Sequence, residues 1–82
     1  MKKLLLLMMI LVSTLFAKID INTADTRTLS TLPGIGPAKA QAIIEWREEN
    51  GGFKHVRDMQ NVPGIGPRTY EQIREQIAVG KE

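Results

Sequence analysis

Apolar side chains recur at three- and four-residue spacing through most of the chain after residue 20, and this spacing predicts short helices. The first expected helix begins at Asn22, which forms a capping-box pattern with Asp25, and it stops before Pro33. The second begins at Pro37, because proline suits the first turn of a helix, and it ends at the Asn-Gly-Gly of 50–52.

Two further helices are expected in the last third of the chain. A short one covers 56–60, and another starts at Pro67 with Ile73 and Ile77 on its inner face. An extended segment, 18–22, leads into the first helix. No stretch alternates apolar and polar residues as a half-buried strand does, so we expect an all-α fold of four to five short helices. Because such short helices are marginal alone, they must share one core.

The hydrophobic pattern repeats at a period of thirty residues. The stretch "LPGIGPAKAQAI" at 32–43 returns as "VPGIGPRTYEQI" at 62–73. Each half of the chain therefore has the order helix, hairpin, helix. The apolar positions match across the repeat, pairing Leu29 with Met59, Leu32 with Val62, and Ile43 with Ile73. This match predicts two similar units packed on each other.

Each glycine-proline hairpin ends at a helix start, where backbone amides have no partner inside the helix. These amides and the helix dipole favour an anion, and glycines without a Cβ let a phosphate come close. The apolar residue at each hairpin tip is expected to tuck between the helices. The candidate anion-binding residues are Gly34, Ile35, Gly36, Ala38 and Lys39 in the first copy, and Gly64, Ile65, Gly66, Arg68 and Thr69 in the second.

The charges in these first turns favour an anion site over a plain connector. A first turn normally carries Asp or Glu, because a carboxylate stabilises the positive end of the helix. Here each first turn carries a cation, Lys39 or Arg68, and no acid. A single glycine-proline turn would be an ordinary connector. Two copies in register, each followed by a cation, predict paired phosphate contacts and hence a nucleic-acid ligand.

The first seventeen residues predict an export signal. Two lysines precede an apolar run, 4–12, and Ala17 suits the residue before a cleavage site. The run is shorter than the roughly 20 residues that span a membrane. We therefore expect a signal peptide, 1–17, and one exported domain, 18–82. Leu15 stands where a smaller residue is usual, so an uncleaved N-terminal anchor stays open as the alternative.

The charge of the chain limits the way in which it can bind an anion. The chain carries a formal charge of +2, with eleven Lys and Arg against nine Asp and Glu. Lys2 and Lys3 belong to the predicted signal, so 18–82 is formally neutral. A general basic field is the usual sign of a nucleic-acid binder. Since 18–82 lacks one, any phosphate binding must be local.

Other chemistry finds little support in the sequence. His55 is the sole histidine and the chain has no cysteine, so we expect no metal site. "GIGPAK" matches neither a dinucleotide fingerprint nor a phosphate loop, so we expect no cofactor and no enzyme. Trp46 could stack on a base, but its position beside an apolar stripe favours the core. Four basic residues are equally compatible with phosphate contact and plain solvation: Arg27, Lys54, Arg57 and Arg74.

Together these residues resemble a known family. The carrying segments are "INTA" at 21–24, "LPGIGPAKAQAIIEWR" at 32–47, "GGF" at 51–53 and "VPGIGP" at 62–67. They are similar to the ComEA-type tandem helix-hairpin-helix domain, (HhH)2, of bacterial competence proteins. The resemblance covers about 21–77, which is most of the predicted exported domain.

The resemblance implies sequence-independent binding of double-stranded DNA through hairpin amides at 34–39 and 64–69. It further implies a periplasmic location and a role in DNA uptake during natural transformation. The implied partners are duplex DNA, an inner-membrane DNA channel or pilus components, and further copies of the chain on DNA.

Two departures qualify this expectation. Motifs of this kind often place a small residue four positions after the second glycine, as Ala40 does, whereas the second copy has Tyr70. We therefore expect the first hairpin to make the stronger contact. The neutral charge also fits an alternative function, that of a periplasmic protein-interaction module in an uptake or secretion machine.

Overall fold

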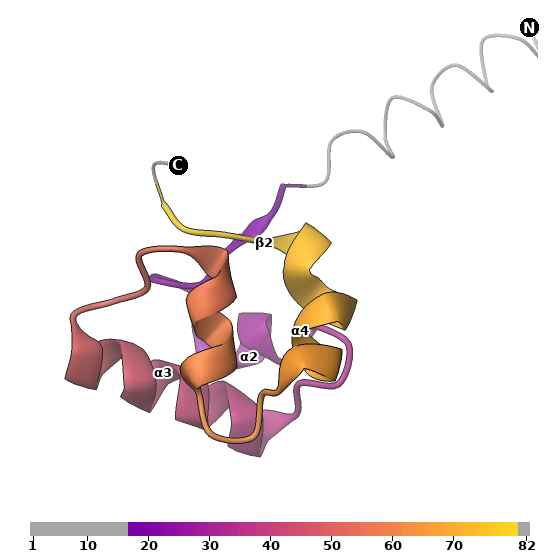
Figure 1. Cartoon of the computed structure of the whole chain (residues 1–82), viewed down its shortest axis with the longest axis horizontal. Coiled ribbons are helices and arrows are strands. Elements are labelled where there is room, and N and C mark those ends of the chain that lie inside the picture. Colours follow the sequence, from indigo (N-terminus) through magenta and orange to yellow (C-terminus); the bar gives the residue numbers. More distant parts are fainter. Residues whose placement is uncertain (1–16, 81–82) are drawn as a thin grey trace, which may run out of the picture.

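The computed structural model describes residues 17–80 (Figure 1). Apart from Ala17, the predicted signal peptide lies outside the described residues. The elements in chain order are β1 (Ile19–Asp20), α2 (Thr26–Leu29), α3 (Pro37–Asn50), the 3-10 helix η1 (Val56–Asn61), α4 (Pro67–Ile73), the 3-10 helix η2 (Arg74–Gln76) and β2 (Ile77–Ala78). The expected mostly helical character is confirmed, and α2, α3, η1 and α4 correspond to the four predicted helices.

The core repeats with the period that the sequence predicts. Equivalent positions of the two halves are buried to the same degree: Leu29 and Met59, Leu32 and Val62, Ile35 and Ile65, and Ile43 and Ile73. The α2 helix packs on α3, and η1 packs on α4. Both halves thus contribute to a single apolar cluster. Burial in this shared core supplies the stability that helices of four to seven residues lack alone.

The prediction of a purely α-helical chain is wrong at its two ends. The lead-in and the tail form a parallel pair in which Ile19 lies opposite Ile77 and Asp20 opposite Ala78. The Ile21 N–H donates to the Ala78 carbonyl at 3.0 Å and extends the contact. In Figure 1 the pair lies at the top of the domain, where the indigo lead-in crosses the yellow tail. Strands of two residues are too short to show an alternating pattern, so the sequence could not reveal them.

The predicted cap of the first helix is also corrected. Asp25, rather than Asn22, is the N-cap of α2, and its carboxylate accepts the Thr28 N–H at 2.8 Å. Asn22 instead joins the lead-in to the loop after α3. Its side-chain amide donates to the Phe53 carbonyl at 3.0 Å, and its side-chain oxygen accepts the Phe53 N–H at 2.6 Å. One side chain therefore satisfies both backbone groups of a residue 31 positions away.

The last predicted helix is shorter than expected. The α4 helix ends at Ile73, tightens into the η2 turn and then becomes extended, so Ile77 is buried in β2 and not on a helix face. Pairing with the lead-in gives the backbone of β2 hydrogen-bond partners that a longer helix would have supplied. The fold thereby closes its two ends against each other.

An aromatic and a basic side chain of α3 hold the loop after this helix and the lead-in in place. Trp46 is half-buried and stacks on the buried Phe53, with ring centroids 4.7 Å apart, which confirms its predicted place beside the core. The Arg47 guanidinium donates to the carbonyls of Ile21 and Ala24 at 3.0 and 2.7 Å. These contacts hold the lead-in against α3.

Within 17–80 no helix combines the length and the apolar character that a membrane span requires.

Candidate functional site

The two glycine-proline hairpins have the same backbone structure. In the first, Ile35 N–H donates to the Leu32 carbonyl at 3.1 Å; in the second, Ile65 N–H donates to the Val62 carbonyl at 3.0 Å. The first glycine of each copy has a left-handed backbone, with φ of 78° at Gly34 and 93° at Gly64. A side chain resists this conformation, so the turn itself requires these two glycines.

The second glycine of each copy has no such conformational reason. Gly36 and Gly66 are the N-caps of α3 and α4, with ordinary φ values of −90° and −99°. A Cβ built at either position would meet nothing within 4 Å. The protein therefore leaves open space directly in front of each helix start, where a side chain would fit the fold but would stand in the way of a ligand.

The amides behind these glycines have no side-chain cap. Neither α3 nor α4 has a capping side chain or an acid in its first turn. In each copy the first helical hydrogen bond begins at the fourth residue after the glycine, from Ala40 N–H to the Gly36 carbonyl and from Tyr70 N–H to the Gly66 carbonyl. The predicted donor amides before these positions are thus available to a ligand at the surface.

The starts of α2 and η1 follow the usual rule. Asp25 caps α2, and the hydrogen bond from Thr28 N–H lowers the pKa of its carboxyl below the ordinary value of 3.8. At η1, the Asp58 carboxylate accepts the N–H groups of His55 and Lys54 at 3.0 and 3.1 Å, and the His55 bond is the main cause of its lowered pKa. Acids thus occupy the helix starts outside the hairpins, whereas the hairpin starts carry cations.

The predicted site residues divide into backbone and side-chain roles. Ile35 and Ile65 are each only 3% exposed, which confirms that the hairpin tips are apolar anchors turned into the core. Their side chains are therefore closed to a ligand, and their N–H groups already donate within the turn. Ala38 and Arg68 are exposed, and Lys39 and Thr69 are half-buried.

The hairpins lie against each other's helices in a crosswise arrangement. A Cβ at Gly34 would lie 4.0 Å from the Thr69 methyl and 3.4 Å from the Gln72 side-chain oxygen, both on α4. A Cβ at Gly64 would lie 3.7 Å from Lys39 Cγ on α3. Because Lys39 and Thr69 are equivalent positions of the repeat, these reciprocal contacts relate the two units by an approximate two-fold rotation. The structure therefore brings the two predicted sites together at one seam.

Lys39 belongs to both sides of this seam. Its Nζ lies 3.4 Å from the Gly34 carbonyl, while its aliphatic stem lies beside Gly64. Repeat alignment places Lys39 in the first hairpin only. Gln72, which lies on α4 beside the first hairpin, has no counterpart among the predicted site residues. An expectation that the two units cross would have predicted both the contact of Lys39 with the second hairpin and the position of Gln72 beside the first.

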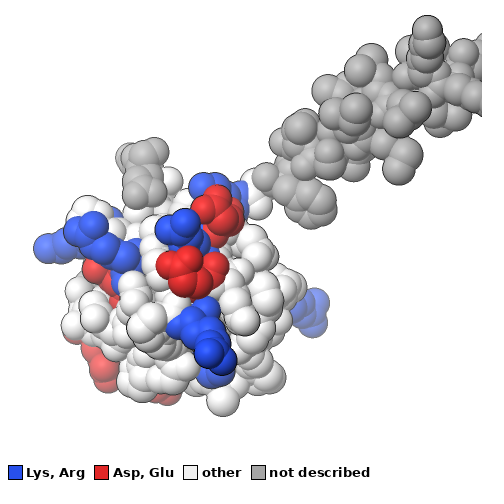
Figure 2. Space-filling view, turned by 45° about the vertical axis from the view of Figure 1, so that its right-hand side comes forward, with Lys and Arg blue, Asp and Glu red and all other residues white. Residues whose placement is uncertain are grey.

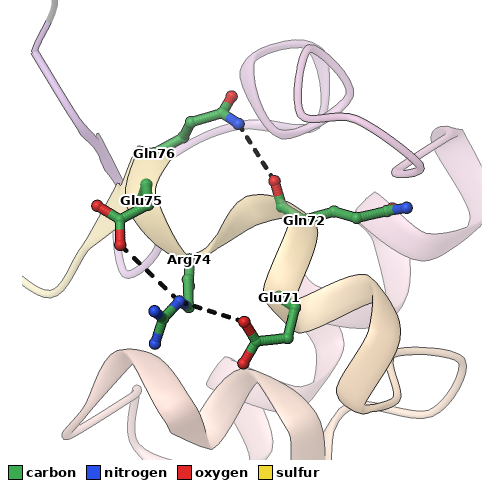
Figure 3. A network of polar contacts seen from close by, with 5 residues as sticks. All are labelled: Glu71, Gln72, Arg74, Glu75 and Gln76. Atoms are coloured by element: carbon green, nitrogen blue, oxygen red, sulfur yellow. Dashed lines mark hydrogen bonds and ion pairs between the residues drawn. The ribbon is translucent and has the colours of Figure 1, made fainter.

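The charge around the site is local, as the sequence predicts. On the face shown in Figure 2, basic side chains alternate with acidic ones, and much of the surface between them is uncharged. Arg74, one of the four basic candidates outside the hairpins, lies between Glu71 and Glu75 at 3.4 and 3.8 Å (Figure 3). All three side chains are largely exposed, so the pairs contribute little stability but neutralise the guanidinium. Arg27, Lys54 and Arg57 are exposed.

No cluster of three His, Cys, Asp or Glu side chains able to hold a metal occurs within 17–80. His55 is exposed at the start of η1.

Known proteins are similar to this chain in sequence. The helix-hairpin-helix motif family matches residues 16–78. ComE operon protein 1 of Bacillus subtilis is 46% identical over 63 residues, which are 77% of this chain and 31% of that protein. An uncharacterized protein of Haemophilus influenzae is 41% identical over 61 residues, or 73% of this chain and 54% of that protein.

Larger proteins contain the same segment. The human endonuclease/exonuclease/phosphatase family domain-containing protein 1 is 43% identical over 65 residues, which are 79% of this chain but 11% of that protein. The chain thus spans about a third or less of the length of the first of these relatives and of the human one. Since the family match covers most of the sequence and both of its hairpins, this chain belongs to the helix-hairpin-helix family.

Proposed function

We propose that this chain binds double-stranded DNA through backbone phosphates at its two hairpins, without sequence preference. The observation that carries the proposal is the contrast among the helix starts. Two are capped by Asp carboxylates, while the two after the hairpins have open glycines, no acid and a nearby cation. A phosphate would supply the missing negative partner for the amides. Contacts to phosphate carry no base information, so the binding is independent of sequence.

The two hairpins act as one tandem unit, (HhH)2, in this proposal. Support comes from the crosswise contacts of Gly34 with Thr69 and of Gly64 with Lys39, which hold the two helix starts at a fixed separation. Two phosphate contacts held apart by a rigid core fit a polymer with regularly spaced charges better than a single small anion. The proposed site residues are those predicted from the repeat, with the isoleucines acting as buried anchors that position the hairpins.

The biological role proposed is the capture of DNA during natural transformation. It is supported by the similarity to ComE operon protein 1 and by the export signal that the sequence predicts. The chain would act in the periplasm after signal cleavage, or from an uncleaved N-terminal anchor. It would pass DNA to an inner-membrane channel or receive it from pilus components, and further copies would bind along the same DNA.

The proposed role requires no catalysis and no cofactor. In the endonuclease/exonuclease/phosphatase family relative, the similar segment makes up about a tenth of the length. In the present chain the same segment makes up most of the sequence. We therefore assign it the task of holding DNA and not of cutting it.

A gel-shift experiment with the purified chain and duplexes of unrelated sequence tests this function. We expect every duplex to bind with similar affinity at low salt. Reversing both hairpin cations, with Lys39→Glu and Arg68→Glu, should abolish the shift. Arg74→Glu is the matched control, because Arg74 is already paired with two carboxylates. Absence of any shift for the wild-type chain at low salt would refute DNA binding.

A further inference from the structure

A surface hollow lies along α3, beyond the hairpin seam, and the proposed DNA contacts do not use it. It has a volume of about 250 Å³ and is lined by Ala42, Glu45, Trp46, Glu49, Asn61 and Pro63. The first four come from successive turns of α3, and the last two from the end of η1 and the start of the second hairpin. We infer that this hollow is a docking site for a Lys or Arg side chain of a partner polypeptide.

The lining combines an apolar floor with an acidic rim. Ala42, Trp46 and Pro63 supply carbon surface, while Glu45 and Glu49 lie one helical turn apart on α3. Lysine and arginine have the complementary construction, since an apolar stem carries a cationic head. A volume of about 250 Å³ is suited to one long side chain and lies below the usual range for drug-sized ligands.

The indole at this site is held in place before any partner arrives. Trp46 stacks on Phe53 with an interplanar angle of 21°, and Phe53 is in turn fixed by Asn22. An aromatic ring that is fixed and also lines an open hollow offers a ready surface for a cation. Because the ring does not have to reorganise, binding loses little to ordering.

The charges of the hollow select a cation over a phosphate. No Lys or Arg lines it. Within 17–80 the ion pairs are those of Arg74, so Glu45 and Glu49 are not neutralised by a neighbour. Glu45 has one long hydrogen bond, 3.4 Å, from the Gln41 amide.

Phosphates of DNA would be repelled here, so a bound duplex and a basic partner would occupy separate surfaces. A free metal ion is less suited, because no third ligating side chain joins the two glutamates.

The test uses the emission of Trp46, which is the sole tryptophan of the chain. The purified full-length chain is titrated with a blocked peptide of alternating arginine and serine. The matched peptide has citrulline in place of arginine, which keeps the shape and removes the charge. We expect a saturable change in emission with the arginine peptide, weakening with salt, and none with the citrulline peptide.

Variants separate the hollow from general electrostatic attraction. Glu45→Gln and Glu49→Gln should each weaken the arginine peptide by about two- to five-fold, as expected for exposed charge pairs. Glu48→Gln is the matched control, because it removes the same charge from an exposed residue of α3 that does not line the hollow. Asn61→Lys places a resident cation at the rim and should weaken the peptide at least as much, without disturbing the core.

Several results would overturn the inference. Equal weakening by Glu48→Gln would mean that the peptide senses only the general charge of α3. Equal binding of the citrulline peptide would exclude recognition of the cation. A change of Trp46 emission with protein concentration alone would make a second copy the occupant. None of these results depends on whether the hairpins bind DNA.

Discussion

At the scale of single residues, the glycines of one five-residue hairpin serve different purposes. Gly34 and Gly64 have left-handed backbones that the turn requires, whereas Gly36 and Gly66 have ordinary backbones and open space around them. The sequence presents all four as identical turn glycines. The backbone angles show that the turn requires glycine at only one pair, and under the proposed function ligand access accounts for the other.

This distinction predicts that Gly36→Val separates binding from stability. A Cβ at Gly36 meets no atom of residues 17–80 within 4 Å, so the folded state should be destabilised by no more than about 1 kcal/mol, the scale of an N-cap change. It would block the amides, and the loss of a hydrogen bond to a charged group costs about 1.5–3 kcal/mol. We expect at least about a tenfold loss of duplex affinity in a gel shift.

Gly51→Ala is the matched control for this substitution. Gly51 has φ of 75° at the end of α3, and a Cβ there would also meet nothing within 4 Å. The alanine should therefore strain the backbone and lower stability by about 1 kcal/mol, while duplex affinity stays unchanged. If Gly36→Val and Gly51→Ala lost stability and affinity in parallel, the access argument would be wrong.

Asn22 is a residue whose importance the sequence conceals. Its side chain makes two hydrogen bonds to the backbone of Phe53. Asn22→Ala leaves both backbone groups without these partners, so we expect a loss of about 1–3 kcal/mol in urea unfolding. Asn50→Ala is the control, because Asn50 is exposed and makes one bond within its own helix, to the Trp46 carbonyl. It should cost less than about 0.5 kcal/mol. Similar losses for both variants would contradict the bridging role.

At the scale of helices and hairpins, the sequence predicted starts better than ends. Pro37 and Pro67 mark their helix starts correctly, because proline fits a first turn and the repeat shows the signal twice. The end of α4 at Ile73 was missed, since no glycine or proline marks it and the cause is pairing with β1. The cap at Asn22 was misassigned because its true partner is distant in the chain. Local signals were therefore reliable, and contacts between segments far apart were not.

The capped helix starts predict how stability changes with acid. The pKa values of Asp25 and Asp58 are lowered in the folded chain by backbone N–H groups, and protonation removes these bonds. The stabilisation is therefore complete above the ordinary value of 3.8 and is lost as pH falls through the lower folded values. We expect the melting temperature to fall between about pH 4 and pH 2.

Asp25→Asn isolates this effect, because asparagine keeps the capping oxygen but does not ionise. The variant should be close to wild type at neutral pH and should lose less stability in acid. Glu48→Gln, at an exposed position of α3, should follow the wild-type curve. An acid transition that Asp25→Asn leaves unchanged would remove Asp25 from the explanation.

The two hairpins should contribute unequally to binding. The α3 helix has fourteen residues and a fully buried Ala40 four positions after its N-cap glycine. The α4 helix has seven residues and a half-buried Tyr70 at the equivalent position. Lys39 also contacts both hairpins, while Arg68 is simply exposed. We therefore expect Lys39→Met to weaken duplex binding more than Arg68→Met when both are measured in one gel-shift series. An equal or reversed order would show that the larger residue in the second copy does not matter.

At the scale of the whole molecule, charge balance limits the strength of binding. Residues 18–82 are formally neutral, and Arg74 is held by two carboxylates, so no extended basic face backs the hairpins. Under the proposed function, affinity would rest on the phosphates at the two helix starts and on few others. Such a protein would gain firm attachment by placing several copies on one DNA and not by a large interface per copy.

Few phosphate contacts predict a shallow dependence on salt. Each displaced counterion contributes about −0.9 to the slope of log K against log salt concentration, so two contacts give a slope of about −2. Raising salt from about 50 to 200 mM should then weaken binding about tenfold, far less than for proteins with an extended basic surface. Gly66→Val should bring the slope closer to −1, since it removes one contact, whereas Arg74→Glu should leave it unchanged. A wild-type slope steeper than about −4 would mean that the exposed residues Arg27, Lys54 and Arg57 share the contact, and the interface would then extend beyond the hairpins.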